Sequence, residues 1–166
     1  KYKNLLTIII PRHIHRVNKI FQEIDDLKLN VVLHSSGPKK LKNADIYLVD
    51  TYGETKKFYD CSDVVFMGKS LAGKGGQNPL EPARSGAAVL HGPNIDNFSD
   101  IYRLLEKLKI TYKVNGETSL RNLVNKLIIK PNSKKNYLKI EKIGKKILDE
   151  TKDEINSLLN NEIKKT

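Results

Sequence analysis

Short apolar runs alternate with amphipathic stretches along most of this chain. The runs are rich in Val, Ile and Leu and have the length of buried strands; they cover residues 5–10, 30–34, 46–49, 63–67, 87–90 and 110–114. Apolar residues at helical spacing predict helices over 14–28, from 51 to about 61, briefly from 79, from 97 or 99 to 108, over 120–128 and from 134 onward. Strands that alternate with helices in this way predict βαβ units and a parallel sheet.

The length of the chain predicts a single domain with one core. A chain of 166 residues is long enough to bury a core of its own. We expect this core over about residues 4–130, followed by C-terminal helices over about 134–161. Gly144 and the polar run 149–153 predict a weakened middle in this helical tail.

The loop over residues 70–82 is the most distinctive stretch, and it lies between two strand-like runs. Gly75 and Gly76 permit positive φ and a close approach of the backbone to a ligand. Asn78 is a good helix N-cap, the following proline suits the first helical position, and Glu81 falls in the first turn. A free helix N-terminus beside glycines is a natural phosphate site. The same residues also suit a well-capped helix start without a ligand.

Two familiar phosphate-binding motifs fail at this loop. A P-loop that ends at Ser70 needs a glycine at position 63, where Asp63 stands. The dinucleotide-binding pattern that starts at Gly73 needs a glycine at position 78, where Asn78 stands. The loop therefore belongs to neither class of site.

Two further loops follow strand-like runs, and ligands bind at the carboxyl ends of parallel strands. The loop 11–13 reads Pro-Arg-His, and the guanidinium of Arg12 suits bidentate binding of a phosphate. The loop 52–54 reads Tyr-Gly-Glu. Plain structural alternatives exist for both: surface residues in the first, and a capping box of Thr51 and Glu54 at a helix start in the second. Together with 70–82, these loops are suited to cradle one nucleotide.

Composition and charge narrow the class of protein. The chain is 39% hydrophobic and 30% charged, which is ordinary for a globular domain. Its formal net charge of +11 suits nucleic acid, an anionic membrane surface or an anionic ligand. The basic residues are mostly scattered lysines without interleaved aromatic residues, so we favour a composition bias over nucleic-acid binding.

Several other kinds of site are not indicated. The single Cys61 excludes an internal disulfide framework and fits a reducing compartment. The sequence shows no metal-ligand spacing and no recognisable catalytic triad. No apolar run approaches the length of a membrane span, and no signal peptide is visible. Lys1 is not a natural start, so we expect a fragment whose N-terminal part lies elsewhere.

The central loop carries a resemblance to a known family. Residues 75–83 (Gly-Gly-Gln-Asn-Pro-Leu-Glu-Pro-Ala), then 89–93 (Val-Leu-His-Gly-Pro) and Asn97-Phe98, resemble the 3-deoxy-D-manno-octulosonic acid (Kdo) transferases. These enzymes build the inner core of lipopolysaccharide on lipid A. They have two Rossmann-like domains in the GT-B arrangement, and the resemblance, over about residues 5–115, is to the second domain. It implies an α/β fold with a Rossmann-like parallel sheet and helices on both faces.

The resemblance also implies a function. CMP-Kdo would be the donor, and the reaction an inverting, metal-independent sugar transfer to the lipid A precursor at the cytoplasmic face of the bacterial inner membrane. Arg12 would neutralise the CMP phosphate, amides near 52–54 and Asn78 would hold phosphate and ribose, and Glu81 would accept a ribose hydroxyl. The implied donor-binding residues are Pro11, Arg12, His13, Tyr52, Gly53, Glu54, Ser70, Gly75, Gly76, Asn78, Pro79, Leu80 and Glu81.

The resemblance places no catalytic residue in this chain. The catalytic base, a glutamate in this family, and most of the acceptor site belong to the N-terminal acceptor domain, which we expect to be absent here. The expected partners are therefore CMP-Kdo, the protein's own N-terminal domain, the lipid A precursor through that domain, and the anionic inner-membrane surface, but no nucleic acid. No cofactor is expected.

The chain departs from the family at three positions. Lys69 stands where the family has glycine, Gln77 where it has histidine, and Tyr52 where it has methionine. Two other classes of function stay open. One is a GT-B transferase that uses a UDP- or GDP-sugar, and the other is a basic module that binds anions or nucleic acid.

Overall fold

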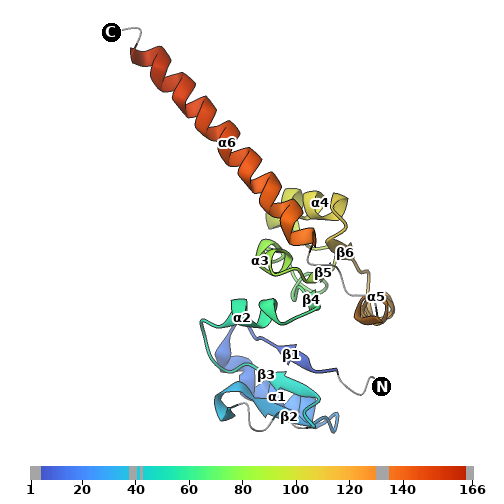
Figure 1. Cartoon of the computed structure of the whole chain (residues 1–166). Helices are drawn as coiled ribbons and strands as arrows, with labels where there is room; N and C mark the ends of the chain where they lie inside the picture. Colours follow the sequence, from blue (N-terminus) through green and yellow to red (C-terminus); the bar gives the residue numbers. More distant parts are fainter. Residues whose placement is uncertain (1–4, 38–40, 42, 130–134, 164–166) are drawn as a thin grey trace. The chain divides into compact units, whose positions relative to one another are not determined.

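The structure, a computed structural model, describes residues 5–37, 41, 43–129 and 135–163. The chain divides into two compact units, Lys1–Phe58 and Tyr59–Thr166, and each is described here by itself. Every strand pair in both units is parallel, and helices alternate with strands along the chain (Figure 1). The predicted α/β class with parallel strands is therefore confirmed.

The first unit contains a three-stranded sheet in the order β1-β3-β2. Its strands are β1 (Thr7–Ile9), β2 (Val31–Leu33) and β3 (Ile46–Leu48). The connections include the 3-10 helices η1 (Ile14–Arg16) and η2 (His34–Ser36) and the helix α1 (Val17–Asp25). The central strand β3 is buried along its whole length, because parallel strands in such sheets are covered by their crossover connections.

The second unit contains a sheet in the order β4-β5-β6. Its strands are β4 (Val64–Phe66), β5 (Ala88–His91) and β6 (Thr111–Lys113). The helix α2 (Thr55–Asp60) runs from the first unit into the second. The remaining helical elements are α3 (Leu80–Arg84), η4 (Asp96–Phe98), α4 (Ser99–Lys107), α5 (Glu117–Ile129) and α6 (Lys135–Ile163).

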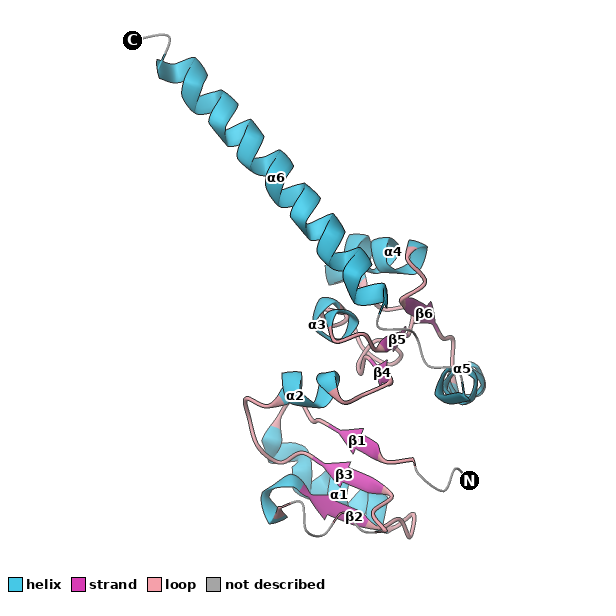
Figure 2. Ribbon diagram, viewed as in Figure 1, coloured by secondary structure: helices cyan, strands magenta, loops and turns pink. Residues whose placement is uncertain are grey.

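The sheet of the second unit is covered on both faces, because alternate residues of β5 point to opposite sides. Val89 joins Leu105 of α4 and Ile140 of α6 in one apolar cluster. Leu90 joins Leu127 of α5 in the other cluster. Figure 2 shows α5 on one side of these strands and α4 with the start of α6 on the other. In this unit the helices lie on both faces of the sheet, as predicted.

The C-terminal region is one uninterrupted helix, α6, so the predicted weak point near Gly144 and 149–153 is wrong. An i,i+4 ion pair between Lys146 and Glu150 (3.6 Å) spans this stretch and favours the helix. Large apolar side chains along the helix are exposed; they are Leu138, Ile147, Leu148, Ile155, Leu158 and Leu159.

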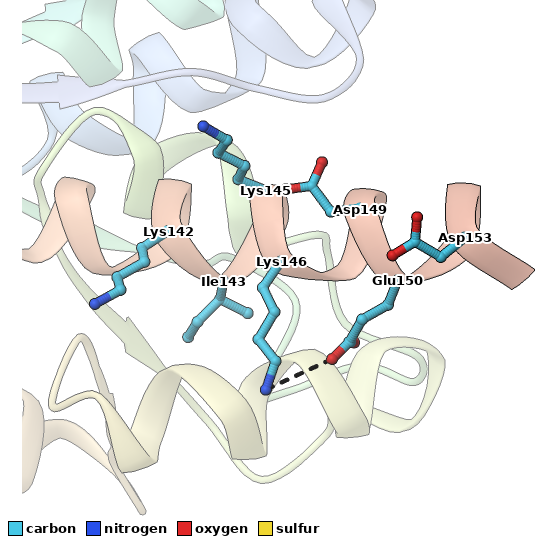
Figure 3. Close-up of a pocket in the computed structure, with 7 residues that line it drawn as sticks. All are labelled: Lys142, Ile143, Lys145, Lys146, Asp149, Glu150 and Asp153. Atoms are coloured by element: carbon cyan, nitrogen blue, oxygen red, sulfur yellow. Dashed lines mark ion pairs between the residues drawn. The ribbon is translucent and has the colours of Figure 1, made fainter.

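A shallow hollow of about 490 Å³ lies along α6 (Figure 3). It is lined by residues of this one helix; they are Lys142, Ile143, Lys145, Lys146, Asp149, Glu150 and Asp153. It therefore has no wall from a second element and contains none of the predicted site residues. Within the described part of the chain, no helix is both long and apolar enough to cross a bilayer.

Two local predictions differ from the structure. The helix expected from residue 51 begins only at Thr55, so Thr51 and Glu54 do not form a capping box at its start. The Thr51 hydroxyl donates to the Glu54 carboxylate at 3.5 Å, and this carboxylate also bonds to His34 and Lys57. His91, which lies just beyond the strand expected over 87–90, is the last residue of β5 and is buried, because it continues the ladder beside Lys113 of β6.

Candidate functional site

The strand order of the first unit brings two predicted site loops to the same sheet edge. Since β1 and β2 both pair with β3 in parallel, the loops that follow all three strands start at one end of the sheet. The backbone N–H of Val49 donates to the carbonyl of Ile9 at 2.9 Å, which ties the exits of β1 and β3 together. The loops 11–13 and 52–54 follow these two exits.

The loop 11–13 presents its basic side chains to solvent. Arg12 and His13 are exposed, while Pro11 is half-buried at the end of the strand run. The imidazole rings of His13 and His15 stack with centroids 5.4 Å apart. Because the Arg12 guanidinium is solvent-accessible and permanently charged, it is suited to an anionic ligand.

The loop 52–54 holds one strained backbone position and one exposed aromatic ring. Gly53 has φ +90°, a conformation that side-chain-bearing residues rarely adopt. A Cβ atom built there has no neighbour within 4 Å, so glycine is required by the backbone conformation and not by lack of space. Tyr52 is 72% exposed, so its ring is not part of the core.

Glu54 is held by two side chains, of His34 and Lys57, that are not among the predicted donor-binding residues. Its Oε2 lies 2.5 Å from Nε2 of His34, and its Oε1 accepts from Nζ of Lys57 at 2.7 Å. The other ring nitrogen of His34, Nδ1, lies 2.7 Å from the hydroxyl of Tyr47. The hydrogen bonds from Lys57 and then His34 lower the pKa of Glu54, so this carboxyl is ionised at neutral pH.

A second carboxylate links the same two loops. Asp50 accepts from the backbone N–H of Ser35 (2.9 Å) and from its hydroxyl (2.5 Å). Burial acts to raise the pKa of Asp50, but the hydrogen bonds from Ser35 outweigh it and the pKa is lowered. The residues that follow β2 and β3 are thus tied together twice. In the sequence, these pairs could have been found only from their positions. His34 and Ser35 lie at the end of one strand-like run and Asp50 and Glu54 lie after another, and the two strands are neighbours in the sheet.

The glycine-rich loop lies in the second unit and packs against the segment after β5. Gly75 and Gly76 have φ +90° and +63°. A Cβ atom on Gly75 would lie 2.6 Å from Nδ2 of Asn97, and one on Gly76 would lie 2.9 Å from the carbonyl oxygen of Asn94. Both the conformation and the close packing therefore require glycine at these positions.

Ser70 anchors the start of this loop. Its side chain is fully buried; the hydroxyl donates to the carbonyl of Met67 (2.6 Å) and accepts from the backbone N–H of Gly92 (2.8 Å). Its own carbonyl accepts from the backbone N–H of Asn94 at 2.9 Å. These bonds connect the exit of β4 to the exit of β5, where the loop begins.

The Asn-Pro-Leu-Glu segment starts a helix as expected, one residue later. The helix α3 begins at Leu80, and Oδ1 of Asn78 accepts from the backbone N–H of Leu80 at 3.0 Å. Pro79 is buried, Leu80 is half-buried, and Glu81 is exposed in the first turn. With only the residues Leu80–Arg84, this helix is short.

Two of the positions that depart from the family, Lys69 and Gln77, are defined in the structure by their backbone. Lys69 has φ +69°, a left-handed conformation in which glycine is favoured. The carbonyl of Gln77 accepts from the hydroxyl of Tyr102 at 3.0 Å, which is a backbone contact that any residue at 77 can make. Across residues 5–37, 41, 43–129 and 135–163, no group of three or more His, Cys, Asp or Glu side chains is placed to hold a metal ion.

Comparisons with known proteins identify relatives of this chain. No family model matches the chain. A Kdo transferase of Haemophilus influenzae is 32% identical over 160 residues, and one of Rickettsia bellii is 30% identical over 149 residues. The crystal structure of the C-terminal CMP-Kdo binding domain of WaaA from Acinetobacter baumannii superposes with a TM-score of 0.73 at 27% identity, over 80% of this chain and 69% of that domain.

The chain is homologous to the C-terminal domain of the Kdo transferases. The sequence match to the Haemophilus transferase covers 96% of this chain, so it includes all three candidate loops of this Kdo transferase homologue. The chain spans only 37% and 35% of the two relatives named above. The family named from the sequence is confirmed, and so is the domain within it.

Proposed function

We propose that this chain is the donor-binding domain of a glycosyltransferase that moves Kdo from CMP-Kdo to the lipid A precursor in lipopolysaccharide core biosynthesis. The observation that carries the proposal is the match to a solved domain that binds CMP-Kdo, with a TM-score of 0.73 and 27% identity. Homology to Kdo transferases along 96% of the chain supports it.

The proposed roles follow from the chemistry of a CMP leaving group. Arg12 pairs with the phosphate, whose negative charge grows as the bond to Kdo breaks. Backbone amides near Gly53 and Asn78 hold phosphate and ribose, and Glu81 accepts a hydrogen bond from a ribose hydroxyl. The exposure of the Arg12 and Glu81 side chains and the two positive-φ glycines at 75 and 76 are compatible with these roles.

The proposal assigns the catalytic base and most of the acceptor site to the part of the relatives that this chain does not match. The 166-residue chain by itself is therefore expected to bind nucleotide without transferring sugar. Detectable sugar transfer by the isolated chain would refute the assignment of the catalytic base to the other part of the protein. We place the whole protein at the cytoplasmic face of the inner membrane, where a net charge of +11 favours anionic lipid headgroups.

A titration of the chain with CMP tests the proposal, with amide chemical shifts as the readout and UMP and GMP as controls. CMP is expected to shift amides near Arg12, Gly53 and Asn78, and UMP to shift them much less. Arg12→Ala should weaken CMP binding, whereas Arg103→Ala, at an exposed position on α4, should not.

The other outcomes assign other functions. If UMP or GMP moves the same loops as well as CMP does, the donor is a different nucleotide sugar. If no nucleotide moves them, and anionic vesicles or nucleic acid bind in a salt-sensitive way that Arg12→Ala leaves unchanged, the chain is a basic binding module.

A further inference from the structure

His34 is the centre of a small cluster at the exits of β2 and β3. The residue follows β2 directly, and its two ring nitrogens bond to Tyr47 of β3 and to Glu54 in the loop after β3. The ring also packs edge-on against Phe58 of α2, with centroids 5.4 Å apart and an interplanar angle of 82°. Its edge-on contact with the ring of Tyr47 is similar, at 5.5 Å and 88°.

One placement of the protons gives both ring nitrogens of His34 a hydrogen-bond partner. An ionised Glu54 only accepts, so Nε2 of His34 carries the ring hydrogen and donates to it. Nδ1 then accepts from the hydroxyl of Tyr47, which keeps its proton because burial raises the pKa of Tyr47. The ring is thereby fixed by two hydrogen bonds and two ring contacts.

Glu54 is still able to bind a ligand in this arrangement. Each carboxylate oxygen accepts about two hydrogen bonds. Oε2 accepts from His34 and, at 3.5 Å, from the Thr51 hydroxyl, whereas Oε1 accepts from Lys57 and has room for a donor from a ligand. The side chain of Glu54 is 29% exposed, so a donor group from solvent can reach it. The Lys57 side chain is 77% exposed, and an exposed ion pair of this kind contributes little to order.

The backbone of residues 51–53 is not held by regular secondary structure. Residues 51–53 have no helix or strand structure, Gly53 has a positive φ, and Tyr52 is exposed. The Asp50–Ser35 hydrogen bonds hold the start of this loop, and the side chain of Glu54, through His34, links its end to the strands.

We propose that His34 is a positioning residue for nucleotide binding: it fixes the Glu54 carboxylate, and with it the backbone of the loop 52–54, in the orientation that receives the donor nucleotide. This inference rests on the proposed function. It assigns a role to a residue outside the candidate loops and predicts that the hydrogen bond, and not the packing of the ring, matters for binding.

Two substitutions separate the hydrogen bond from the packing. His34→Phe keeps an aromatic ring beside Phe58 and Tyr47 but removes both hydrogen bonds. His34→Gln loses the ring but keeps an N–H donor for Glu54. We expect His34→Phe to raise the Kd for CMP about tenfold, the size of effect typical of a lost hydrogen bond to a charged group. We expect His34→Gln to recover most of the affinity, and Lys57→Gln to change it less than about twofold.

A purely structural role predicts the opposite order, with His34→Phe binding CMP like the wild type and His34→Gln binding poorly. That result overturns the inference and leaves the proposed function intact. Absence of CMP binding by the wild-type chain overturns both. Urea unfolding of each variant reports whether it is folded.

A double-mutant cycle keeps the test decisive if His34→Phe is poorly folded. In a Glu54→Gln background, His34→Leu, which also removes both hydrogen bonds, is expected to weaken CMP binding less than it does in the wild-type chain, because the charged acceptor of the hydrogen bond is already changed. Equal effects of His34→Leu in the two backgrounds would overturn the inference.

Discussion

Gly92 shows how closely the glycine-rich loop is packed onto the exit of β5. A Cβ atom on Gly92 would lie 2.3 Å from the carbonyl oxygen of Ser70 and 2.5 Å from its carbonyl carbon. These are backbone atoms that cannot swing aside as a side chain can. The hydrogen bond between the two residues also depends on this spacing.

We expect Gly92→Ala to lower the free energy of unfolding by about 1–3 kcal/mol, the usual effect of overpacking a tight site. Urea denaturation measures it. Gly116→Ala is the matched control, because a Cβ atom there has no neighbour within 4 Å and the φ of Gly116 is not positive. Equal destabilisation by both substitutions would contradict the role of this contact.

His91 makes the second unit sensitive to mild acid. It is 3% exposed, its Nδ1–H donates to the carbonyl of Gly92 (2.8 Å), and its ring lies 4.4 Å from that of Tyr102. Burial lowers the pKa of His91 below its usual 6.5. The unfolded chain then binds a proton more readily than the folded chain, so stability is lost as pH falls below about 6.5.

Unfolding free energies between pH 7.5 and 5.5 test this effect. Glu54 and Asp50 have lowered pKa values, so their contributions are lost only at more acidic pH than this window. We expect the wild-type chain to lose more stability across the window than His91→Met does, whatever the stability of the variant at pH 7.5. Parallel pH profiles would show that His91 is not the titrating group.

Among the elements, β5 is the one on which the second unit depends most. Leu90 is fully buried between β4 and β6 and packs toward α5. We expect Leu90→Ala to cost about 2–5 kcal/mol of unfolding free energy, as large-to-small core substitutions do. Leu158→Ala, the same change at a position 62% exposed on α6, should cost less than about 0.5 kcal/mol. Thermal and urea unfolding of the two variants provide the comparison.

The helices and strands were largely predictable from sequence, because each has a strong apolar period. Each of the six strand-like runs overlaps a strand, and the helix after Asn78 begins within one residue of the expected position. The start of α2 was missed because the capping-box spacing is a local signal. In the structure the Glu54 carboxylate bonds to His34, a residue 20 positions away, and lies 3.5 Å from the Thr51 hydroxyl.

The links that order the candidate loops could not be predicted in the same way. The pairing of His34 with Glu54 and of Ser35 with Asp50 depends on β2 and β3 being neighbours. Periodicity indicates that a strand exists but not which strand lies beside it. The burial of His91 has the same origin, because it depends on β6 continuing alongside the last residue of β5.

At the scale of the whole molecule, the net charge of +11 opposes compactness. We expect the unfolding free energy to rise when NaCl is increased from about 10 mM to 150 mM, since the screening length falls from about 30 Å to 8 Å. Replacing Lys139, Lys142 and Lys145 on α6 by Gln removes three charges and leaves about +8, and should weaken the dependence. Urea titrations at several salt concentrations measure it, and stability that falls with salt would contradict it.

The helix α6 has one more consequence, for how the protein can be studied. At 1.5 Å per residue its 29 residues extend about 44 Å, and its packing onto the second unit is concentrated near Ile140. Because the helix is long, a tilt of about 10° at its base would displace its C-terminal end by about 8 Å. A spectroscopic probe placed near residue 158 would therefore magnify small rearrangements of the second unit on nucleotide binding into distances that are easy to measure.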